Sequence, residues 1–281
     1  MKSASQIWLL SVLDVGKLYR PLTKEQYGFL PDMARASKGF FNWYTWRAEL
    51  LLEALGLCTA AIAEEKEKRV VVIHGAGSFG HFEVRELGLT AEGIARTRQA
   101  VTSLSKIVCD ELTGRGARPV SLAPFGIVQT TDGRLARDGE RALCRAATAA
   151  LDAGLLPVFH GDIVLDSKRG AAVLSGDDVL AAICRHGVVD RAIFVTDVEG
   201  VYDKNPRLDP TAKLIPELTS RRVDTAGATD ATGGMRAKLD AAFRAARAGV
   251  PVTILAPPQF PAALKKDEGD GHVTPSTRVR C

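Results

Sequence analysis

The sequence predicts an α/β fold, a mainly parallel sheet with helices on both faces. Two observations carry this prediction. Apolar, β-branched runs such as Val70–Ile73 are typical of strands that are buried on both faces of a sheet. Amphipathic helical patterns, such as residues 91–114, separate these runs, and strands that alternate with helices favour parallel pairing. The chain of 281 residues, 46% of them hydrophobic and 25% charged, is long enough to bury a sizeable core.

The expected elements follow one another in regular order from residue 48 onward. They are helix 48–69, strand 70–73, helix 91–114, strand 118–123, helix 141–154, strand 155–161, helix 175–187, strand 191–197, helix 231–249 and strand 250–256. Ser175 or Asp177 is expected to cap the helix at 175, because both side chains accept hydrogen bonds from free N–H groups. The polar tract 265–271 is expected to be a surface loop.

Bulk properties exclude several classes of protein. The net charge of +4 forms no basic stripe of the kind that nucleic-acid-binding proteins show. Five widely spaced cysteines without a CxxC pair argue against a disulfide framework or a zinc site. No apolar run reaches the roughly 18 residues of a membrane span, and the start lacks a signal-peptide cleavage pattern. We therefore expect a cytoplasmic protein without nucleic-acid or membrane partners.

The motif GAGSFG, residues 75–80, is the first candidate for a ligand site. It matches GxGxxG, but the acidic residue that a dinucleotide-binding fold places about 20 residues later is missing. No GxxxxGK[ST] sequence exists either. We interpret the segment as an anion cradle, in which the N–H groups from Gly75 to Gly80 face a phosphate near a helix N-terminus. His81 would then donate to a phosphate oxygen, or would simply cap the following helix.

Four further segments carry polar residues where parallel strands or helices begin or end. TDVEGVYDKNP, residues 196–206, follows an expected strand, at the edge where open α/β sheets bind ligands. TDATGGMRAK, residues 229–238, offers glycine N–H groups and Lys238 to a phosphate. Asp162, Asp177 and Asp178 could order a lysine or bind Mg²⁺ through water, or could be surface caps.

Together and in this order, these segments resemble the amino acid kinase superfamily. Within it, HGAGSFGH, residues 74–81, closely resembles the signature of isopentenyl phosphate kinases, and the final histidine is its narrowest feature. The resemblance runs from about residue 70 to the C-terminus. It implies a three-layer αβα sandwich that transfers the ATP γ-phosphoryl group to isopentenyl phosphate, with Mg²⁺, in isoprenoid biosynthesis. It also implies a homodimer.

The resemblance implies a role for each matching residue. The acceptor would be bound by Gly75, Ala76, Gly77, His81, Gly161, Asp162 and Gly176. The nucleotide would be bound by Thr196, Asp197, Gly200, Tyr202, Asp203, Gly233, Gly234 and Lys238. His81, Lys238, Asp177 and Lys24 would be catalytic, with Asp177 organising the lysines. The chain would be a single domain over residues 1–281, with an acceptor half at about 70–188 and a nucleotide half at about 189–281.

The first 69 residues depart from the family pattern. The family begins with a strand followed by a Lys-x-Gly-Gly-Ser/Ala loop and a second lysine. Here IWLLSV, residues 7–12, is a candidate strand, but no Gly-Gly follows; Lys17 and Lys24 are candidates for the two lysines. All three tryptophans also lie in this segment. Two alternatives therefore stay open: a kinase for another phosphate, phosphonate or carboxylate acceptor, and a non-catalytic relative that binds phosphate ligands.

Overall fold

An eight-stranded sheet forms the centre of the computed structural model, which describes residues 7–12, 56–65, 68–187, 189–206, 208–219, 233–265 and 273–281. The strand order across the sheet is β12 (Glu217–Thr219), β14 (Thr277–Arg280), β13 (Val252–Leu255), β9 (Arg191–Val195), β1 (Ile7–Val12), β2 (Arg69–His74), β6 (Leu156–His160) and β3 (Pro119–Leu122). Neighbouring strands pair in parallel, except that β13 and β14 are antiparallel. The predicted mainly parallel sheet is confirmed.

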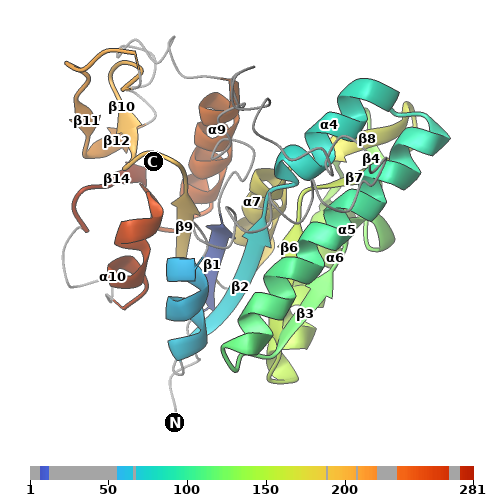
Figure 1. Ribbon diagram of the computed structural model, residues 1–281, viewed down its shortest axis with the longest axis horizontal. Coiled ribbons are helices and arrows are strands. Elements are labelled where there is room, and N and C mark those ends of the chain that lie inside the picture. Colours follow the sequence, from blue (N-terminus) through green and yellow to red (C-terminus); the bar gives the residue numbers. More distant parts are fainter. Residues whose placement is uncertain are drawn as a thin grey trace, which may run out of the picture.

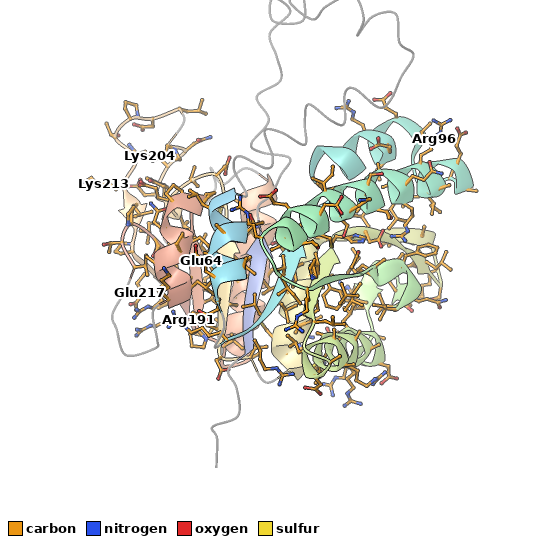
Figure 2. All side chains as sticks on the ribbon, turned by 60° about the horizontal axis from the view of Figure 1, so that its bottom comes forward. Glu64, Arg96, Arg191, Lys204, Lys213 and Glu217 are labelled. Carbon is orange, nitrogen blue, oxygen red and sulfur yellow. The ribbon has the colours of Figure 1, made fainter. Side chains whose placement is uncertain are left out.

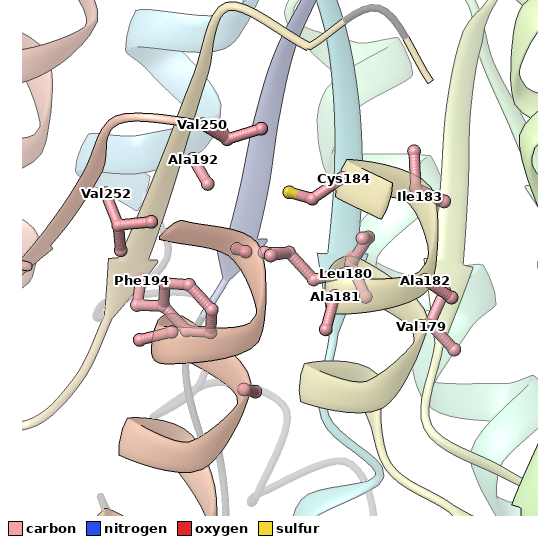
Figure 3. Close-up of a cluster of buried hydrophobic side chains, with 14 of the residues drawn as sticks. Val179, Leu180, Ala181, Ala182, Ile183, Cys184, Ala192, Phe194, Val250 and Val252 are labelled. Carbon is pink, nitrogen blue, oxygen red and sulfur yellow. The ribbon is translucent and has the colours of Figure 1, made fainter. Parts of the chain in front are cut away.

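Helices cover both faces of this sheet (Figure 1). A helix over residues 56–64, α5 (Ala91–Gly114) and α10 (Phe260–Lys265) bury one face. The opposite face is covered by α6 (Arg137–Asp152), α7 (Gly176–His186) and α9 (Gly233–Arg247). Alternate residues of each strand enter the two cores: in β2, Val72 packs on the α5 side and Ile73 on the α7 side. Figure 3 shows the second core, where Leu180 and Ala181 of α7 lie near Phe194 of β9. These layers make the αβα sandwich.

The strand expected at residues 7–12 lies in the middle of the sheet. β1 pairs in parallel with β2 on one side, with Val12 aligned to His74, and with β9 on the other. The prediction that IWLLSV is a strand is confirmed. Residues 13–55, which include Lys17 and Lys24, lie outside the described residues.

The long helices match their predicted positions because their apolar residues recur with a clear helical periodicity and a glycine marks the C-terminal end. The bounds of α5 are those expected, and Gly154 and Gly249 adopt φ values of +72° and +85° just beyond α6 and α9. Such a φ is open to glycine without strain, so the chain turns away there. Ser175 is the cap of α7, accepting a hydrogen bond from the Asp178 N–H at 3.0 Å. The cap prediction is confirmed for Ser175.

Helix α4 (Gly77–Leu87) begins earlier than the sequence predicts, so the expected cradle from Gly75 to Gly80 is corrected. The Gly80 N–H donates to the Ala76 carbonyl at 3.2 Å and is therefore not available to a ligand. A Cβ on Gly80 would lie 2.8 Å from the Ala76 Cβ and 3.2 Å from Val101 of α5. Gly80 thus lets α4 approach α5 closely, while the N–H groups of the first helical turn remain candidates for an anion.

Short hairpins extend beyond the central sheet. A four-stranded sheet has the order β5 (Arg134–Leu135), β4 (Thr130–Thr131), β7 (Asp162–Asp166) and β8 (Gly170–Leu174), and β10 (Val201–Tyr202) pairs with β11 (Leu214–Ile215). The Asp166 carboxylate accepts hydrogen bonds from the Thr130 hydroxyl at 2.7 Å and the Gly133 N–H at 2.7 Å. Desolvation raises the pKa of Asp166, but these and neighbouring hydrogen bonds outweigh it and hold the pKa well below its usual range. The ionised Asp166 carboxylate therefore joins the β7–β8 hairpin to the β4–β5 hairpin.

The described helices include none that is long and apolar enough to cross a bilayer.

Candidate active site

The predicted ligand-binding residues gather at one edge of the central sheet, where its parallel strands end. Gly75 and Ala76 follow β2, Gly161 and Asp162 follow β6, and Thr196 and Asp197 follow β9. β1 separates β2 from β9. The chain therefore forms β2 on one side of β1 and, much later in the sequence, β9 on the other side. Open α/β sheets bind ligands at such a switch point.

Three backbone segments meet closely where β2 and β6 end and α7 begins. The Gly161 N–H donates to the His74 carbonyl at 2.9 Å. A Cβ on Gly161 would lie 3.1 Å from the nitrogen of Gly176 and 3.2 Å from that of Ala76, and a Cβ on Gly176 would lie 3.1 Å from the His74 oxygen. Because the atoms in the way belong to the backbone, a side chain at Gly161 or Gly176 would force these segments apart by a few tenths of an ångström. We call this meeting of Ala76, Gly161 and Gly176 the glycine cradle.

Two helices begin beside the glycine cradle. Ala76 is the N-cap of α4, and Gly176 is the first residue of α7. The free N–H groups and the partial positive charge of a helix N-terminus favour an anion. Gly77 starts α4 and His81 lies in its second turn; the His81 side chain falls outside what the structure describes. The cradle has the backbone chemistry of a phosphate site.

Asp177 and Lys238 come together from different helices. The Lys238 ammonium donates to Asp177 Oδ1 at 2.9 Å and lies 5.6 Å from the centre of the Phe194 ring. The Lys238 side chain is only 2% exposed, whereas that of Asp177 is 18% exposed. A buried ammonium needs such a carboxylate, because desolvation of an unpaired charge is costly. The next pair along the same helices, Arg244 and Asp178 at 2.5 Å, also ties α9 to α7.

Asp162 is engaged within the protein. Its side chain is fully buried; one oxygen accepts from Arg98 at 2.5 Å and from the Phe125 N–H at 3.1 Å, and the other accepts from the Ile163 N–H at 2.9 Å. The Arg98 guanidinium also stacks on the Phe125 ring, 4.9 Å from its centre. These contacts hold the chain where β6 passes into β7.

The residues after β9 build the β10–β11 hairpin. A Cβ on Gly200 would lie 2.5 Å from the Thr277 hydroxyl, so glycine allows this turn to pack on β14. The Tyr202 hydroxyl donates to Glu199 at 3.0 Å, and the Asp203 carboxylate accepts from the Lys213 N–H at 2.7 Å. Figure 2 shows Lys204 and Lys213 together on this hairpin, across the molecule from Arg96 of α5. Thr196 is fully buried, and its hydroxyl donates to Asp197 at 3.1 Å.

Helix α9 brings the last predicted motif to the site. Gly233 and Gly234 are its first residues, and Lys238 follows in the second turn. Residues 220–232 lie outside the described residues. In the part of the chain that the structure describes, no cluster of three or more His, Cys, Asp or Glu side chains could hold a metal ion.

The sequence motifs assign no role to two buried histidines beside the cradle. His74 and His160 lie directly before Gly75 and Gly161, with their ring centres 5.5 Å apart. The signal in the sequence was weak: each is a histidine between a buried strand and a glycine. Only the pairing of β2 with β6, which aligns His74 with His160, brings them together.

Comparison with known proteins agrees with this arrangement. The model of the amino acid kinase family matches residues 50–256. The chain belongs to the amino acid kinase family. The isopentenyl phosphate kinase of Arabidopsis thaliana is 33% identical over 215 residues, which cover 66% of this chain and 64% of the plant protein. That of Methanothermobacter thermautotrophicus is 32% identical over 212 residues, covering 69% of this chain and 78% of the relative.

A solved structure described as isopentenyl phosphate kinase agrees with this chain over nearly its whole length. Its TM-score is 0.70 at 25% identity, with 98% of this chain and all of the other covered. The predicted amino acid kinase fold and the resemblance to isopentenyl phosphate kinases are confirmed. The division into acceptor and nucleotide halves stays a prediction.

Proposed function

We propose that this chain transfers the γ-phosphoryl group of ATP to isopentenyl phosphate, producing isopentenyl diphosphate and ADP. Gly75, Ala76, Gly77 and His81 would bind the acceptor phosphate, together with Gly161 and Gly176. The residues after β9 and the start of α9 would bind the nucleotide. The similarity to isopentenyl phosphate kinases supports the choice of acceptor.

One structural link carries the proposal. Gly176 and Asp177 are consecutive residues at the start of α7. The Gly176 nitrogen belongs to the glycine cradle, and the Asp177 carboxylate holds Lys238 at 2.9 Å. An acceptor phosphate in the cradle would therefore lie close to a fixed ammonium group. Phosphoryl transfer depends mainly on such positioning and charge neutralisation.

The chemistry needs no general base. The second pKa of a phosphate monoester is about 6, so at neutral pH the acceptor oxygen is already ionised. This oxygen forms the new bond to the γ-phosphorus as the bond to the β-phosphate oxygen of ATP breaks, and the electron pair leaves with ADP. Lys238 would neutralise charge on the transferred group. Asp177 would hold that ammonium in place.

Mg²⁺ fits this site as a partner of the nucleotide. It is usually held by one or two carboxylates together with substrate phosphates and water, and rarely by an all-protein cage. Asp177, with its partly exposed carboxylate, and Asp197 are the described candidates beside the site. When bound, Mg²⁺ would neutralise charge on the ATP phosphates.

The test is coupled ADP release by the purified chain with Mg-ATP and isopentenyl phosphate, beside glutamate and UMP. Turnover with isopentenyl phosphate alone is expected. Turnover only with glutamate or UMP would overturn the choice of acceptor. Light scattering of the same sample tests the homodimer, which stays a prediction.

A non-catalytic phosphate-binding relative is the second candidate. One observation favours it: β1 occupies the central strand position, but the sequence after Val12 lacks the Lys-x-Gly-Gly-Ser/Ala loop. This candidate predicts calorimetric binding of isopentenyl phosphate with no ADP release.

A further inference from the structure

His74 and His160 form a matched pair beneath the glycine cradle. They end the neighbouring strands β2 and β6, in register with each other, and both side chains are buried with 0% relative exposure of the residue. Their side chains project to the α5 side of the sheet, as do Val72 and Val158 two residues earlier. The pair is therefore on the opposite face of the sheet from α7.

Each histidine makes the same hydrogen bond. His74 Nδ1 lies 2.9 Å from the Gly75 carbonyl oxygen, and His160 Nδ1 lies 3.0 Å from that of Gly161. A carbonyl oxygen only accepts, so both Nδ1 atoms carry the proton. Burial, followed by repulsion from His160, lowers the pKa of His74 to about 3, and burial also lowers that of His160 although Asp162 opposes the shift. Both rings are therefore neutral, with the proton on Nδ1.

These hydrogen bonds fix the direction of the following N–H groups. In a planar trans peptide, the C=O and N–H bonds point in opposite directions. When the Gly75 carbonyl is held towards the His74 ring, the Ala76 N–H is turned away from the α5 side, towards Gly161 and Gly176. The Ala76 nitrogen borders the glycine cradle, 3.2 Å from the position of a Cβ on Gly161. His160 holds the Gly161 carbonyl in the same way, and so fixes the backbone where Asp162 begins β7 and pairs with Leu174 of β8.

We propose that His74 and His160 are positioning residues, whose Nδ1–H groups hold the Gly75 and Gly161 carbonyls and so aim the Ala76 N–H at the phosphate of the acceptor and fix Gly161 beside it. The inference rests on the proposed function for the identity of that acceptor. Among the described residues, neither Nε2 atom has a hydrogen-bond partner. The role of each ring therefore lies in Nδ1.

Substitution by Asn or by Gln distinguishes the role of Nδ1 from that of Nε2. In His160→Asn the side-chain NH₂ lies near the position of Nδ1, whereas in His160→Gln it lies near that of Nε2. The same pair is made at His74. His186→Asn is the matched control, because His186 bonds Glu140 at 2.7 Å at the far end of α7.

Calorimetry with isopentenyl phosphate and, separately, with inorganic phosphate measures the affinity. The Gln variants are expected to bind about tenfold more weakly, the effect of losing about one hydrogen bond. The Asn variants are expected to recover most of that loss, and the control is expected to bind as wild type. The KM for ATP should not change in any of them. Equal affinity in the Asn and Gln variants would overturn the proposal. A wild type that binds neither isopentenyl phosphate nor inorganic phosphate would also overturn it.

¹⁵N NMR of the histidine rings tests the tautomer without any substrate. Both rings are expected to show a protonated Nδ1, and the His74 ring is expected not to titrate between about pH 5.5 and 8. A protonated Nε2 in either ring would overturn the proposal. If wild type binds inorganic phosphate but not isopentenyl phosphate, and the Asn and Gln variants differ as expected, the positioning role is supported while the proposed acceptor is wrong.

Discussion

At the scale of single residues, Lys238 bears on both the stability of this chain and its proposed chemistry. Its ammonium is buried and held by Asp177. Replacing both members of a buried ion pair by apolar side chains is often neutral or stabilising, so such a pair is seldom needed for stability. The charge is therefore best explained by a task in the reaction.

We predict that Lys238→Met lowers kcat by about 10²–10³-fold, the usual effect of removing one preorganised charge that acts in the transition state. Thermal stability should fall only in part, because the unpaired Asp177 carboxylate is partly exposed and lies in the first turn of α7, where the helix N-terminus stabilises it. Steady-state kinetics and a melting curve measure both. Lys106→Met, at an exposed position on α5, is the control. A wild-type kcat in Lys238→Met would remove Lys238 from the proposed mechanism.

His74 gives a second residue-scale prediction, the pH dependence of stability. Its folded pKa of about 3 lies below the value of 6.5 for an exposed histidine, so below pH 6.5 the unfolded chain binds the proton more readily. Stability is therefore full above pH 6.5 and falls as the pH decreases. The ring faces His160, which in turn faces Asp162 and Arg98.

From pH 7.5 to 5, His74 should lower the free energy of unfolding by about 2 kcal/mol. Urea unfolding of wild type and His74→Asn at both pH values measures this contribution as a difference, since the other groups titrate in both proteins. An equal pH dependence in the two proteins would contradict the depressed pKa.

At the scale of elements, the glycine cradle depends on three strand and helix ends that meet within backbone contact. We predict that Gly161→Ala raises the KM for isopentenyl phosphate at least about tenfold. The added methyl group would push apart the nitrogens of Ala76 and Gly176, which cannot yield as a flexible side chain could. The KM for ATP should change little.

Gly114→Ala is the matched control at the end of α5, where an added Cβ meets nothing within 4 Å. Because alanine favours the helix, this variant should be more stable by about 0.5 kcal/mol, with unchanged kinetics. Acceptor kinetics as in wild type for Gly161→Ala would show that the acceptor binds elsewhere.

Helices and strands whose apolar residues recur with a clear periodicity could be predicted from the sequence. Those that depend on contacts between distant segments could not. The bounds of α5 follow from its amphipathic pattern. The two-residue strands of the β4–β5 and β10–β11 hairpins are too short to show any period. α4 starts at Gly77, and its Gly80 packs closely on Val101 of α5, a tertiary contact that a turn motif alone does not reveal.

The candidate site also has a part that could be predicted from the sequence and a part that could not. Its glycines and Lys238 could be predicted from motifs, because their residue types and order are distinctive. The pairing of His74 with His160 depends on the register between strands that are 86 residues apart, from 74 to 160. No local pattern contains that register.

At the scale of the whole molecule, the order of the strands explains where both substrates would meet. β1 separates the strands that lead to the glycine cradle from those that lead to the β10–β11 hairpin and α9. Val12 ends β1 beside His74, and β9 ends on the other side. A loop directly after Val12 therefore starts between the two proposed binding regions, the place where phosphate groups of both substrates would be brought into line.

We predict that a Lys-x-Gly-Gly-Ser loop grafted directly after Val12 raises kcat about tenfold or more, because it adds N–H groups and an ammonium at this point. The KM for isopentenyl phosphate should not change, since the glycine cradle on β2, β6 and α7 is untouched. The same graft with alanine at both glycine positions is the control, because a Cβ on each would keep the backbone from approaching the phosphates. Coupled ADP release compares the three chains. If the graft and its control have the same kcat while the acceptor still binds, transfer does not depend on a loop at the end of β1, and the role assigned to this central strand is wrong.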